Sequence, residues 1–189
     1  MVGEAIASAV DVSVEKETAE MAREVTGRWG KIDLLVNNAA LVRRYQKKIR
    51  QRFDKITEED WDKMMAVNVK GAWLCAKAVY PQMKKQNYGK IINMASGTYF
   101  AGAPLFVHYG ASKGAIVSLT RSLSRELGPD NISVNVIAPS LTQTEMTEEI
   151  DPAYAEEFAQ ARCFQRKQYP EDLTDALLFF CLRAQRLYH

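Results

Sequence analysis

The sequence predicts an α/β fold in which a doubly wound parallel sheet is covered by helices on both faces. Short apolar segments alternate along the chain with longer segments of helical character. Strands that alternate with helices usually run parallel, because each helix provides the crossover between two strands. The segment Lys90–Ala95 is short and mostly apolar, as expected for a strand that is buried on both faces.

The first half of the chain is predicted to contain two strands and two helices in alternation. Ala5–Val10 has strand character and is followed by a polar helix over about Val14–Arg28. Gly30 interrupts the chain before a second strand, Ile32–Val36, because glycine readily ends regular structure. A sequence that resembles a capping box then opens a long helix over about Thr57–Lys85.

The second half of the chain continues the same alternation. The buried strand Lys90–Ala95 is followed by a helix over about Val107–Leu127, which Gly128-Pro129 stops. Ile132–Ala138 is the next predicted strand. Two more helices follow, the last over Pro170–Phe180.

No repeat, low-complexity tract or linker divides the chain, so we expect a single domain over residues 1–189. The hydrophobic share of 47% and the charged share of 25% are close to the averages of globular proteins. A net charge of +2 neither favours nor excludes an acidic partner. The longest apolar run, Ala176–Leu182, is too short to span a membrane, and no secretory signal opens the chain.

The three cysteines, Cys75, Cys163 and Cys181, are odd in number and have no paired spacing. This pattern favours a reducing, intracellular setting, so we expect a cytoplasmic protein. The sequence contains no cluster with metal-ligand spacing, and no metal is expected.

The most informative feature is a tyrosine and a lysine four residues apart, Tyr109 and Lys113, with Ser96 thirteen residues before the tyrosine. Residues with the first spacing stand on one face of a helix. A lysine cation beside a phenol favours the phenolate and is expected to lower the tyrosine pKa from about 10. Such a tyrosine can exchange a proton with a carbonyl or an alcohol, and a serine at a strand end can hold the same oxygen.

The same spacing of tyrosine and lysine also occurs at Tyr80 and Lys84, so the spacing alone is weak evidence. The residue thirteen positions before Tyr80 is Val67, which has no hydroxyl group. Ser96, in contrast, closes a predicted buried strand. The serine partner and the strand before it therefore favour Tyr109 and Lys113 as the functional pair.

Five other short segments occur in order along the chain: Asp11-Val12, Leu35–Ala40, Val67–Gly71, Asn93–Ser96 and Val134–Pro139. Together with the serine, tyrosine and lysine they resemble the short-chain dehydrogenase/reductase family, which includes 3-oxoacyl-carrier-protein reductases and many secondary-alcohol dehydrogenases. The resemblance extends from about Ala5 to Phe180.

The resemblance implies a Rossmann-like fold and an oxidoreductase that transfers hydride between NAD or NADP and a carbonyl or secondary alcohol. It implies that Tyr109 is the general acid/base and that Ser96 anchors the substrate oxygen. Lys113 would lower the tyrosine pKa and hold the nicotinamide ribose. Asn68 would hold a water that passes protons to the lysine; the alternative is a tolerated polar residue inside a helix.

The resemblance also implies a set of cofactor contacts: Asp11, Val12, Asn38, Ala39, Ala40, Tyr109, Lys113, Thr142 and Thr144. The small residues 38–40 would lie against the ribose, and Asp11 and Val12 would flank the adenine. The alternatives are that Asn37 and Asn38 cap the sheet through backbone hydrogen bonds and that Asp11 is an ordinary turn residue.

The sequence departs from the family in several places. Ala40 and Ser140 stand where relatives usually have glycine. The family's glycine-rich turn, which binds a pyrophosphate at a helix N-terminus, is not found in the sequence. We therefore expect a sheet that lacks the first strands and the last strand, and a chain truncated at both ends. The alternative function is a non-catalytic truncated remnant that retains only the interaction surfaces of the fold.

Arg43–Arg52 is a basic run with six cations in ten residues. We predict a solvated loop there. The alternatives are attraction to an acidic carrier protein or a phosphate-bearing substrate, and nucleic-acid binding with the interleaved Tyr45, which is the least favoured. We expect a small-molecule carbonyl or alcohol substrate, with no nucleic-acid partner and no membrane.

Two of the predicted helices, Glu59–Lys85 and Val107–Leu127, carry small and apolar residues on more than one face. Since only one face of each can cover the sheet, the other is available to a partner helix. The residues concerned are Ala72, Trp73, Ala76, Val79, Ala111, Ala115, Leu119 and Leu123. We expect a homodimer or homotetramer, as the resemblance also implies.

Overall fold

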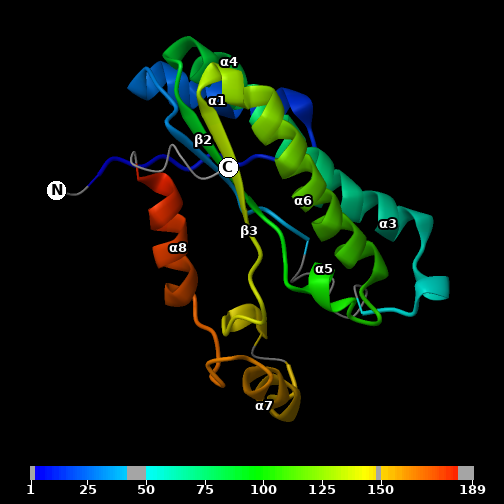
Figure 1. The fold of residues 1–189 in the computed structure, drawn as a ribbon. Helices are drawn as coiled ribbons and strands as arrows, with labels where there is room; N and C mark the ends of the chain where they lie inside the picture. Colours follow the sequence, from blue (N-terminus) through cyan, green and yellow to red (C-terminus); the bar gives the residue numbers. More distant parts are fainter. Residues whose placement is uncertain (1–2, 42–49, 148–149, 183–189) are drawn as a thin grey trace.

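The fold is built on a parallel sheet. The structure, a computed structural model, describes residues 3–41, 50–147 and 150–182. The strands are β1 (Leu34–Asn37), β2 (Gly89–Met94) and β3 (Ile132–Ile137), paired in the order β1–β2–β3 (Figure 1). Asn37 lies opposite Asn93, which in turn lies opposite Val136, and both pairings are parallel. The carboxyl ends of the strands therefore meet at one edge of the sheet.

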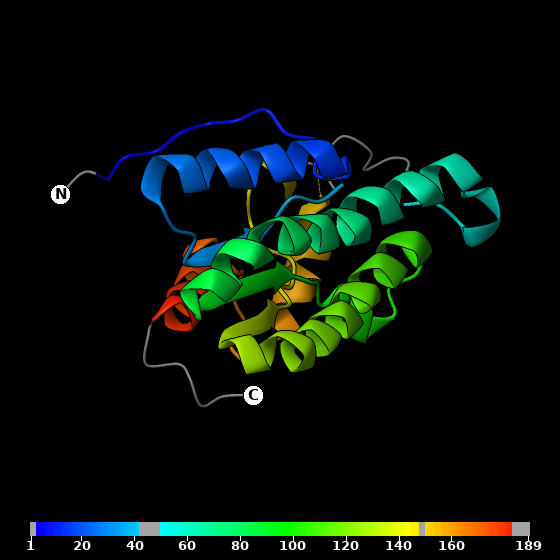
Figure 2. The ribbon, with the colours of Figure 1, turned by 90° about the horizontal axis from the view of Figure 1, so that it is seen from above.

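Helices pack on both faces of this sheet. On one face α1 (Glu15–Trp29), α4 (Gly71–Gln86) and α6 (Val107–Leu127) lie side by side (Figure 2). On the other face α8 (Glu171–Cys181) contacts β2 and β3 (Figure 1). The predicted α/β class with helices on both faces is confirmed. No helix in the described ranges has both the length and the hydropathy needed to cross a bilayer.

Shorter elements lie towards the carboxyl ends of the strands (Figure 1). They are α3 (Glu58–Met65), α5 (Thr98–Ala101), α7 (Pro152–Gln160) and 3-10 turns at Phe53–Lys55 and Glu145–Thr147. A further 3-10 turn, Gly128–Asp130, lies at the opposite end, between α6 and the start of β3. A π-helical turn, Ala66–Lys70, joins α3 to α4, so that the chain is helical without a break from Glu58 to Gln86. This matches the long helix predicted after the capping sequence.

The hydrophobic core lies between the sheet and the layer of α1, α4 and α6. Met83 and Ile91 are fully buried at its centre, where each stabilises the fold by about 1.5–3 kcal/mol relative to an exposed side chain. The main cluster consists of Ala22, Ile32, Ala76, Val79, Met83, Ile91, Leu127, Ile132 and Val134. A smaller cluster of Ala72, Ala95 and Ile116 lies nearer the carboxyl ends of the strands.

Local signals in the sequence correspond closely to the boundaries of the helices. The hydroxyl of Thr57 accepts a hydrogen bond from the backbone N–H of Asp60 at 3.1 Å, as in the predicted cap. Gly30 ends α1 in the left-handed region with φ 72°, where glycine is favoured. Helix α6 covers exactly the predicted span, and the 3-10 turn at Gly128–Asp130 follows it.

The predicted strand Ala5–Val10 is wrong. These residues have no strand structure, and most of their side chains are exposed. A strand is stable only where its N–H and C=O groups pair with a neighbour. Among the described residues, β1 pairs with β2 alone, and nothing pairs with residues 5–10. Residues 5–10 therefore have no neighbouring strand with which to form backbone hydrogen bonds, and the segment does not become a strand.

A buried lysine connects α8 to the sheet. Lys90 of β2 is only 4% exposed, and its ammonium donates hydrogen bonds to the carbonyl oxygens of Phe180 (2.8 Å) and Leu182 (2.5 Å). The last carbonyls of a helix have no partner within the helix and carry partial negative charge. Lys90 therefore binds the C-terminal end of a helix that has no fully buried residue of its own.

Candidate active site

Three polar side chains predicted to act together meet beside the carboxyl end of β2. Ser96 follows this strand, and Tyr109 and Lys113 lie one turn apart on α6. The hydroxyl of Ser96 acts on the phenol of Tyr109 and partly offsets the rise in its pKa that burial causes. The ammonium of Lys113 lies 5.7 Å from the centre of the Tyr109 ring. The structure thus brings together the three residues that the sequence singled out.

Ser96 is held in position by the turn that begins α5. Its hydroxyl donates to the hydroxyl of Thr98 at 3.1 Å and accepts from the backbone N–H of Thr98 at 3.2 Å. These bonds restrict rotation of the serine side chain. The hydroxyl can therefore present a fixed oxygen to whatever lies against Tyr109.

The predicted lowering of the Tyr109 pKa is wrong for this structure. Burial raises the pKa of Tyr109 above its usual value of 10.0, and the Ser96 hydroxyl opposes that rise only partly. The ammonium of Lys113 instead donates to the backbone oxygen of Met94 at 2.7 Å. The spacing predicted that the two residues share a helix face, but not where the lysine's hydrogen bond goes.

Lys113 is a buried cation. Its side chain is 4% exposed, and burial lowers its pKa from 10.5 to about 8. Desolvation has this sign because it disfavours the charged form of a lysine. With a pKa of about 8, Lys113 is mainly protonated at pH 7 and loses its charge as the pH rises through 8. An ammonium so close to its titration point can lose or gain a proton readily.

Asn68 is the residue around which the helix Glu58–Gln86 becomes π-helical. Its amide oxygen accepts from the backbone N–H of Leu41 at 2.8 Å, and its amide nitrogen lies 3.1 Å from the hydroxyl of Ser112. That hydroxyl donates to the backbone oxygen of Tyr109 at 2.7 Å. Single π-turns inside α-helices are frequent at functional sites. Asn68, which is 3% exposed, therefore connects the loop after β1 to the helix of the tyrosine.

The sequence interpretation did not single out Ser112 or the polar ladder behind the site. Asn37 donates to the amide oxygen of Asn93 at 2.8 Å and to the backbone oxygen of Ala72 at 3.2 Å. Asn93 donates to the hydroxyl of Thr120 at 2.9 Å. Asparagine is rare inside strands, and two on neighbouring strands would have indicated this ladder. Asn37 thus makes one bond to the backbone, as in the alternative weighed for it, and one to a side chain of the neighbouring strand.

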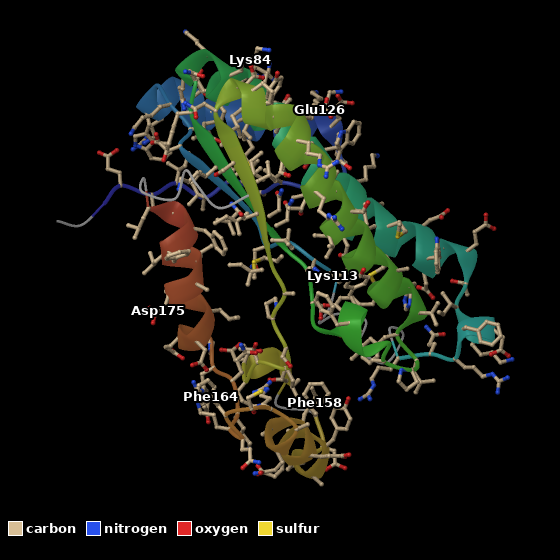
Figure 3. All side chains as sticks on the ribbon, in the orientation of Figure 1. Lys84, Lys113, Glu126, Phe158, Phe164 and Asp175 are labelled. Atoms are coloured by element: carbon tan, nitrogen blue, oxygen red, sulfur yellow. The ribbon has the colours of Figure 1, made fainter. Side chains whose placement is uncertain are left out.

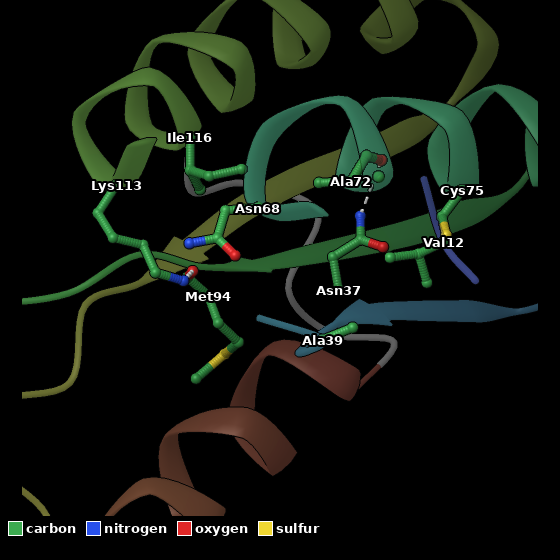
Figure 4. A pocket seen from close by; sticks show the side chains of 10 residues that line it. Val12, Asn37, Ala39, Asn68, Ala72, Cys75, Met94, Lys113 and Ile116 are labelled. Carbon is green, nitrogen blue, oxygen red and sulfur yellow. Dashed lines mark hydrogen bonds between the residues drawn. The ribbon is translucent and has the colours of Figure 1, made fainter. Parts of the chain in front are cut away.

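A small pocket opens beside these residues (Figure 4). It is lined by Val12, Asn37, Ala39, Asn68, Gly71, Ala72, Cys75, Met94, Lys113 and Ile116. Of the residues predicted for the cofactor, the structure places Val12, Ala39 and Lys113 on this wall. Figure 4 shows Lys113 and Val12 at opposite ends of the pocket, with Asn37 and Asn68 between them. The wall between these ends is formed by small and amide side chains.

Other predicted cofactor residues lie outside this lining. The carboxylate of Asp11 accepts from the backbone N–H and hydroxyl of Ser13, at 2.9 and 2.7 Å, and these bonds lower the pKa of Asp11. That is the turn geometry weighed as the alternative for Asp11. Asn38 is exposed, and its N–H donates to the oxygen of Val36 at 3.1 Å. Ala40 follows it in the loop after β1 and is partly exposed.

The loop after β3 contains Thr142 and Thr144. The hydroxyl of Thr142 donates to the backbone oxygen of Ser140 at 3.2 Å, and the N–H of Thr144 donates to the hydroxyl of Thr147 at 2.8 Å. Gln168 accepts from the N–H of Ser140 at 3.2 Å. Both threonines are partly buried, and neither lines the pocket. Hydrogen bonds within the loop and to Gln168 thus fix its conformation, and none of them is made to Ser96, Tyr109 or Lys113.

The chance match, Tyr80 and Lys84, forms a different structure. The hydroxyl of Tyr80 donates to the carboxylate of Asp130 at 2.7 Å, and the ammonium of Lys84 donates to that hydroxyl at 3.0 Å. Figure 3 shows Lys84 at the end of the helical layer remote from Lys113. This cluster fastens α4 to the turn after α6 and is separate from the site.

His108 precedes the tyrosine but faces the interior. It is 1% exposed, and its Nδ1 atom has no hydrogen-bond partner. Burial lowers the pKa of His108, with the negative charge of Asp60 acting in the opposite direction. No hydrogen bond connects this ring to Tyr109 or Lys113 among the described residues.

Gly71 is required by a close approach of two segments. A Cβ atom at this position would lie 2.8 Å from Cγ2 of Val12. We expect Gly71→Ala to lower the free energy of unfolding by about 1–3 kcal/mol, because the added Cβ would also meet the Cβ (3.2 Å) and backbone oxygen (3.4 Å) of Val12. Urea unfolding measures this change.

Gly110 on α6 is the matched control, because a Cβ there meets no atom within 4 Å. Gly110→Ala should therefore raise stability by up to about 1 kcal/mol, the difference in helix propensity. Equal stabilisation by both substitutions would show that Val12 does not approach Gly71 closely.

The basic run predicted as a solvated loop lies largely outside the described residues, since 43–49 are not described. Arg50 and Arg52 are described, and both are exposed. In the described part of the chain, no group of three or more histidine, cysteine, aspartate or glutamate side chains is placed to hold a metal ion.

Comparison with known proteins gives consistent matches. A family model described as enoyl-(acyl carrier protein) reductase matches residues 1–188. The chain is 34% identical over 171 residues to 3-oxoacyl-[acyl-carrier-protein] reductase FabG of Thermotoga maritima, covering 90% of this chain and 67% of that protein. It is 35% identical over 167 residues to 3alpha-hydroxysteroid dehydrogenase of Mediterraneibacter gnavus, covering 87% and 64%. The chain thus spans about two thirds of the length of these relatives.

Solved structures show the same fold. NAD+-bound xylitol dehydrogenase superposes with a TM-score of 0.83 at 27% identity, over 96% of this chain and 74% of that one. ElxO with NADP bound superposes with a TM-score of 0.84 at 25% identity, over 95% and 71%. These matches agree with the predicted Rossmann-like architecture.

Proposed function

This chain belongs to the short-chain dehydrogenase/reductase family, and on that premise we propose that it is an oxidoreductase that uses NAD or NADP. The proposed reaction is hydride transfer between the nicotinamide and a small-molecule carbonyl or secondary alcohol. One observation carries the proposal: the buried ammonium of Lys113 lies 5.7 Å from the ring centre of Tyr109, one helical turn away, and the Ser96 hydroxyl acts on the same phenol. This arrangement suits proton transfer to a carbonyl oxygen.

We assign the proton to Tyr109 in the direction of reduction. Its raised pKa keeps the phenol protonated at neutral pH, so it is a donor ready for an oxygen that gains negative charge. Ser96, whose oxygen is held by the N–H of Thr98, can turn its proton from the Thr98 hydroxyl to the same substrate oxygen. The charge of Lys113 stabilises the phenolate that remains after transfer. The bound nicotinamide supplies the hydride.

Residues around Lys113 fit the rest of this role. Asn68 is buried and reaches Ser112, whose hydroxyl bonds to the backbone of Tyr109, so Asn68 helps to hold the tyrosine and to order water beside Lys113. Lys113 can exchange its bond to Met94 for the ribose of a bound cofactor. Its pKa of about 8 allows it to return a proton to the tyrosine.

We assign the small pocket to part of the cofactor, because Val12 and the small residues Ala39 and Gly71 line it. By family resemblance we assign further contacts to residues outside the lining: Asp11, Asn38, Ala40, Thr142 and Thr144. We also propose that residues 1–189 act as one dinucleotide-binding domain. The free state of all three cysteines supports a reducing, cytoplasmic location.

The test is reduction of a panel of aldehydes and ketones with NADH or NADPH, followed by the loss of nicotinamide absorbance. We expect turnover that depends on the cofactor and saturates with substrate. Absence of turnover with every member of the panel would favour the alternative, a non-catalytic remnant. That alternative is supported by residues 5–10, which do not form the predicted strand and leave the sheet small.

We propose self-association through α4 and α6. The contact surface has fewer residues than the sequence suggested. Three of the predicted residues, Ala72, Ala76 and Val79, are buried in the chain's own core because they face the sheet. Leu119 and Leu123 are partly buried and pack against the core as well. The side chains left for a partner are Trp73, which is 43% exposed, the exposed Ala111 and the partly exposed Ala115. Small side chains such as these alanines allow two helices to approach closely in a symmetric pairing.

Sedimentation at micromolar concentration should show a dimer or tetramer. Replacing the exposed Ala111 by Arg should shift it towards monomer, because two like charges would meet at a symmetric contact. Arg121→Ala, on an exposed position of the same helix, is the control and should leave the assembly unchanged. A folded wild-type monomer would contradict the proposal.

A further inference from the structure

Arg50 is held between two aromatic rings near the site. Its guanidinium carbon lies 5.3 Å from the ring centre of Phe106 and 5.5 Å from that of Tyr154. Phe106 immediately precedes α6 and Tyr154 belongs to α7, so Arg50 connects two separate segments at the carboxyl end of the sheet (Figure 1). Phe106 also stands edge to face with Tyr109, with ring centres 6.0 Å apart. The ring of Phe106 thus contacts both Arg50 and Tyr109, the proposed acid.

No hydrogen bond from the Arg50 side chain is made to another described residue. A guanidinium carries five N–H donors, and contacts with two aromatic rings hold its charge in place without pairing it with an anion. Arg50 is exposed, and the described part of the chain provides no carboxylate in an ion pair with it. The N–H of Gln51 donates to the oxygen of Leu105 at 3.0 Å, which fixes the backbone beside Phe106.

The neighbouring Arg52, on the same segment, has both an aromatic contact and an ion pair. Its guanidinium lies 5.9 Å from the ring centre of Phe53, and its Nε is 2.8 Å from the carboxylate of Asp54. Arg52 therefore has both a ring and a counter-ion, whereas Arg50 has two rings and no counter-ion among the described residues. Within the described ranges, the charge of Arg50 is therefore held in place by the two rings without a counter-ion.

We propose that Arg50 binds an anionic group, a carboxylate or a phosphate, on the substrate whose carbonyl lies at Tyr109. The inference rests on the proposed function and names its substrate class. A guanidinium binds such oxygens through two parallel hydrogen bonds, and its preorganised plane loses little freedom on binding. Phe106 contacts both Arg50 and Tyr109, so one substrate molecule can present its anion to Arg50 and its carbonyl to Tyr109.

Two matched pairs of ketones test this inference. Levulinate is compared with methyl levulinate, and dihydroxyacetone phosphate with dihydroxyacetone, so that each pair differs by the charged group. Arg50→Gln should raise KM for the charged members by about 10- to 100-fold, the worth of charge-assisted hydrogen bonds, and leave the neutral members unchanged. Arg50→Lys should recover part of the loss, because it keeps the charge but not the planar fork. Arg52→Gln is the control and should change neither.

The outcomes are distinct. A preference for one charged ketone alone would support the inference and identify the anion. Equal effects of Arg50→Gln on charged and neutral members would overturn it, and would leave Arg50 as a purely structural connection. If no ketone is turned over, the proposed function fails. Calorimetric titration with levulinate and with dihydroxyacetone phosphate then decides the inference: binding that Arg50→Gln abolishes upholds it, and absence of binding overturns it.

Discussion

Replacing Tyr109 by Phe should lower the rate of carbonyl reduction by about 100- to 10,000-fold, the usual contribution of a positioned proton donor. The phenyl ring keeps the contact with Phe106 and the packing of α6. It loses only the hydroxyl on which Ser96 acts. The loss should therefore appear in kcat, while dinucleotide affinity changes little. Steady-state kinetics with saturating NADH or NADPH measure it.

Tyr80→Phe is the matched control for this prediction. Tyr80 is also followed four residues later by a lysine, but its hydroxyl bonds to Asp130 at the remote end of the helical layer. Removing that hydroxyl should cost stability of about 1 kcal/mol and leave kcat unchanged. If Tyr109→Phe keeps turnover within a factor of a few of the wild type, Tyr109 is not the acid.

Elements with local signals were predictable from the sequence. The cap at Thr57, the glycine that ends α1 and the span of α6 all depend on residues a few positions apart, and each agrees with the structure. The strand predicted at Ala5–Val10 failed because a strand depends on a partner elsewhere in the chain. The apolar pattern of residues 5–10 is a property of the segment itself and does not show whether a neighbouring strand is present to pair with it.

The composition of the site was predictable for similar reasons, but its electrostatics were not. Spacing placed Tyr109 and Lys113 on one face of α6, and the structure adds Ser96 beside them. The direction of each pKa shift depends on burial, which comes from packing against β2 and α3 rather than from neighbours in the sequence. Likewise, the π-turn around Asn68 is a feature of the folded helix that no sequence pattern indicated.

Lys113→Met should abolish most turnover and yet raise the stability of the protein. At pH 7 the folded state contains a buried ammonium, whose pKa is lowered to about 8 from a value of about 10.4 in the unfolded chain. That difference of roughly two units corresponds to about 3 kcal/mol that burial of the charge costs. Methionine removes this cost but leaves the oxygen of Met94 without its donor, a loss of about 1–3 kcal/mol. We expect a net gain of about 1 kcal/mol.

The pH dependence of stability distinguishes this explanation from others. Between pH 8 and about 10.4 the unfolded chain binds more protons at this lysine than the folded one, so wild-type stability rises with pH there and is flat below pH 8. Tyr109, with its raised pKa, acts in the opposite direction only above about pH 10. Lys113→Met should lack the rise, so its advantage over the wild type shrinks from pH 8 upwards.

Urea unfolding of both proteins at several pH values measures this difference. Lys77→Met is the control, because Lys77 is exposed and paired with Glu15 at 2.6 Å. Its loss should change stability by less than about 1 kcal/mol. A variant Lys113→Met that is less stable than the wild type at pH 7 would show that the hydrogen bond to Met94 outweighs the cost of the buried charge. In that case the lysine would support the fold as well as the reaction, and the proposed conflict between stability and activity at this residue would be wrong.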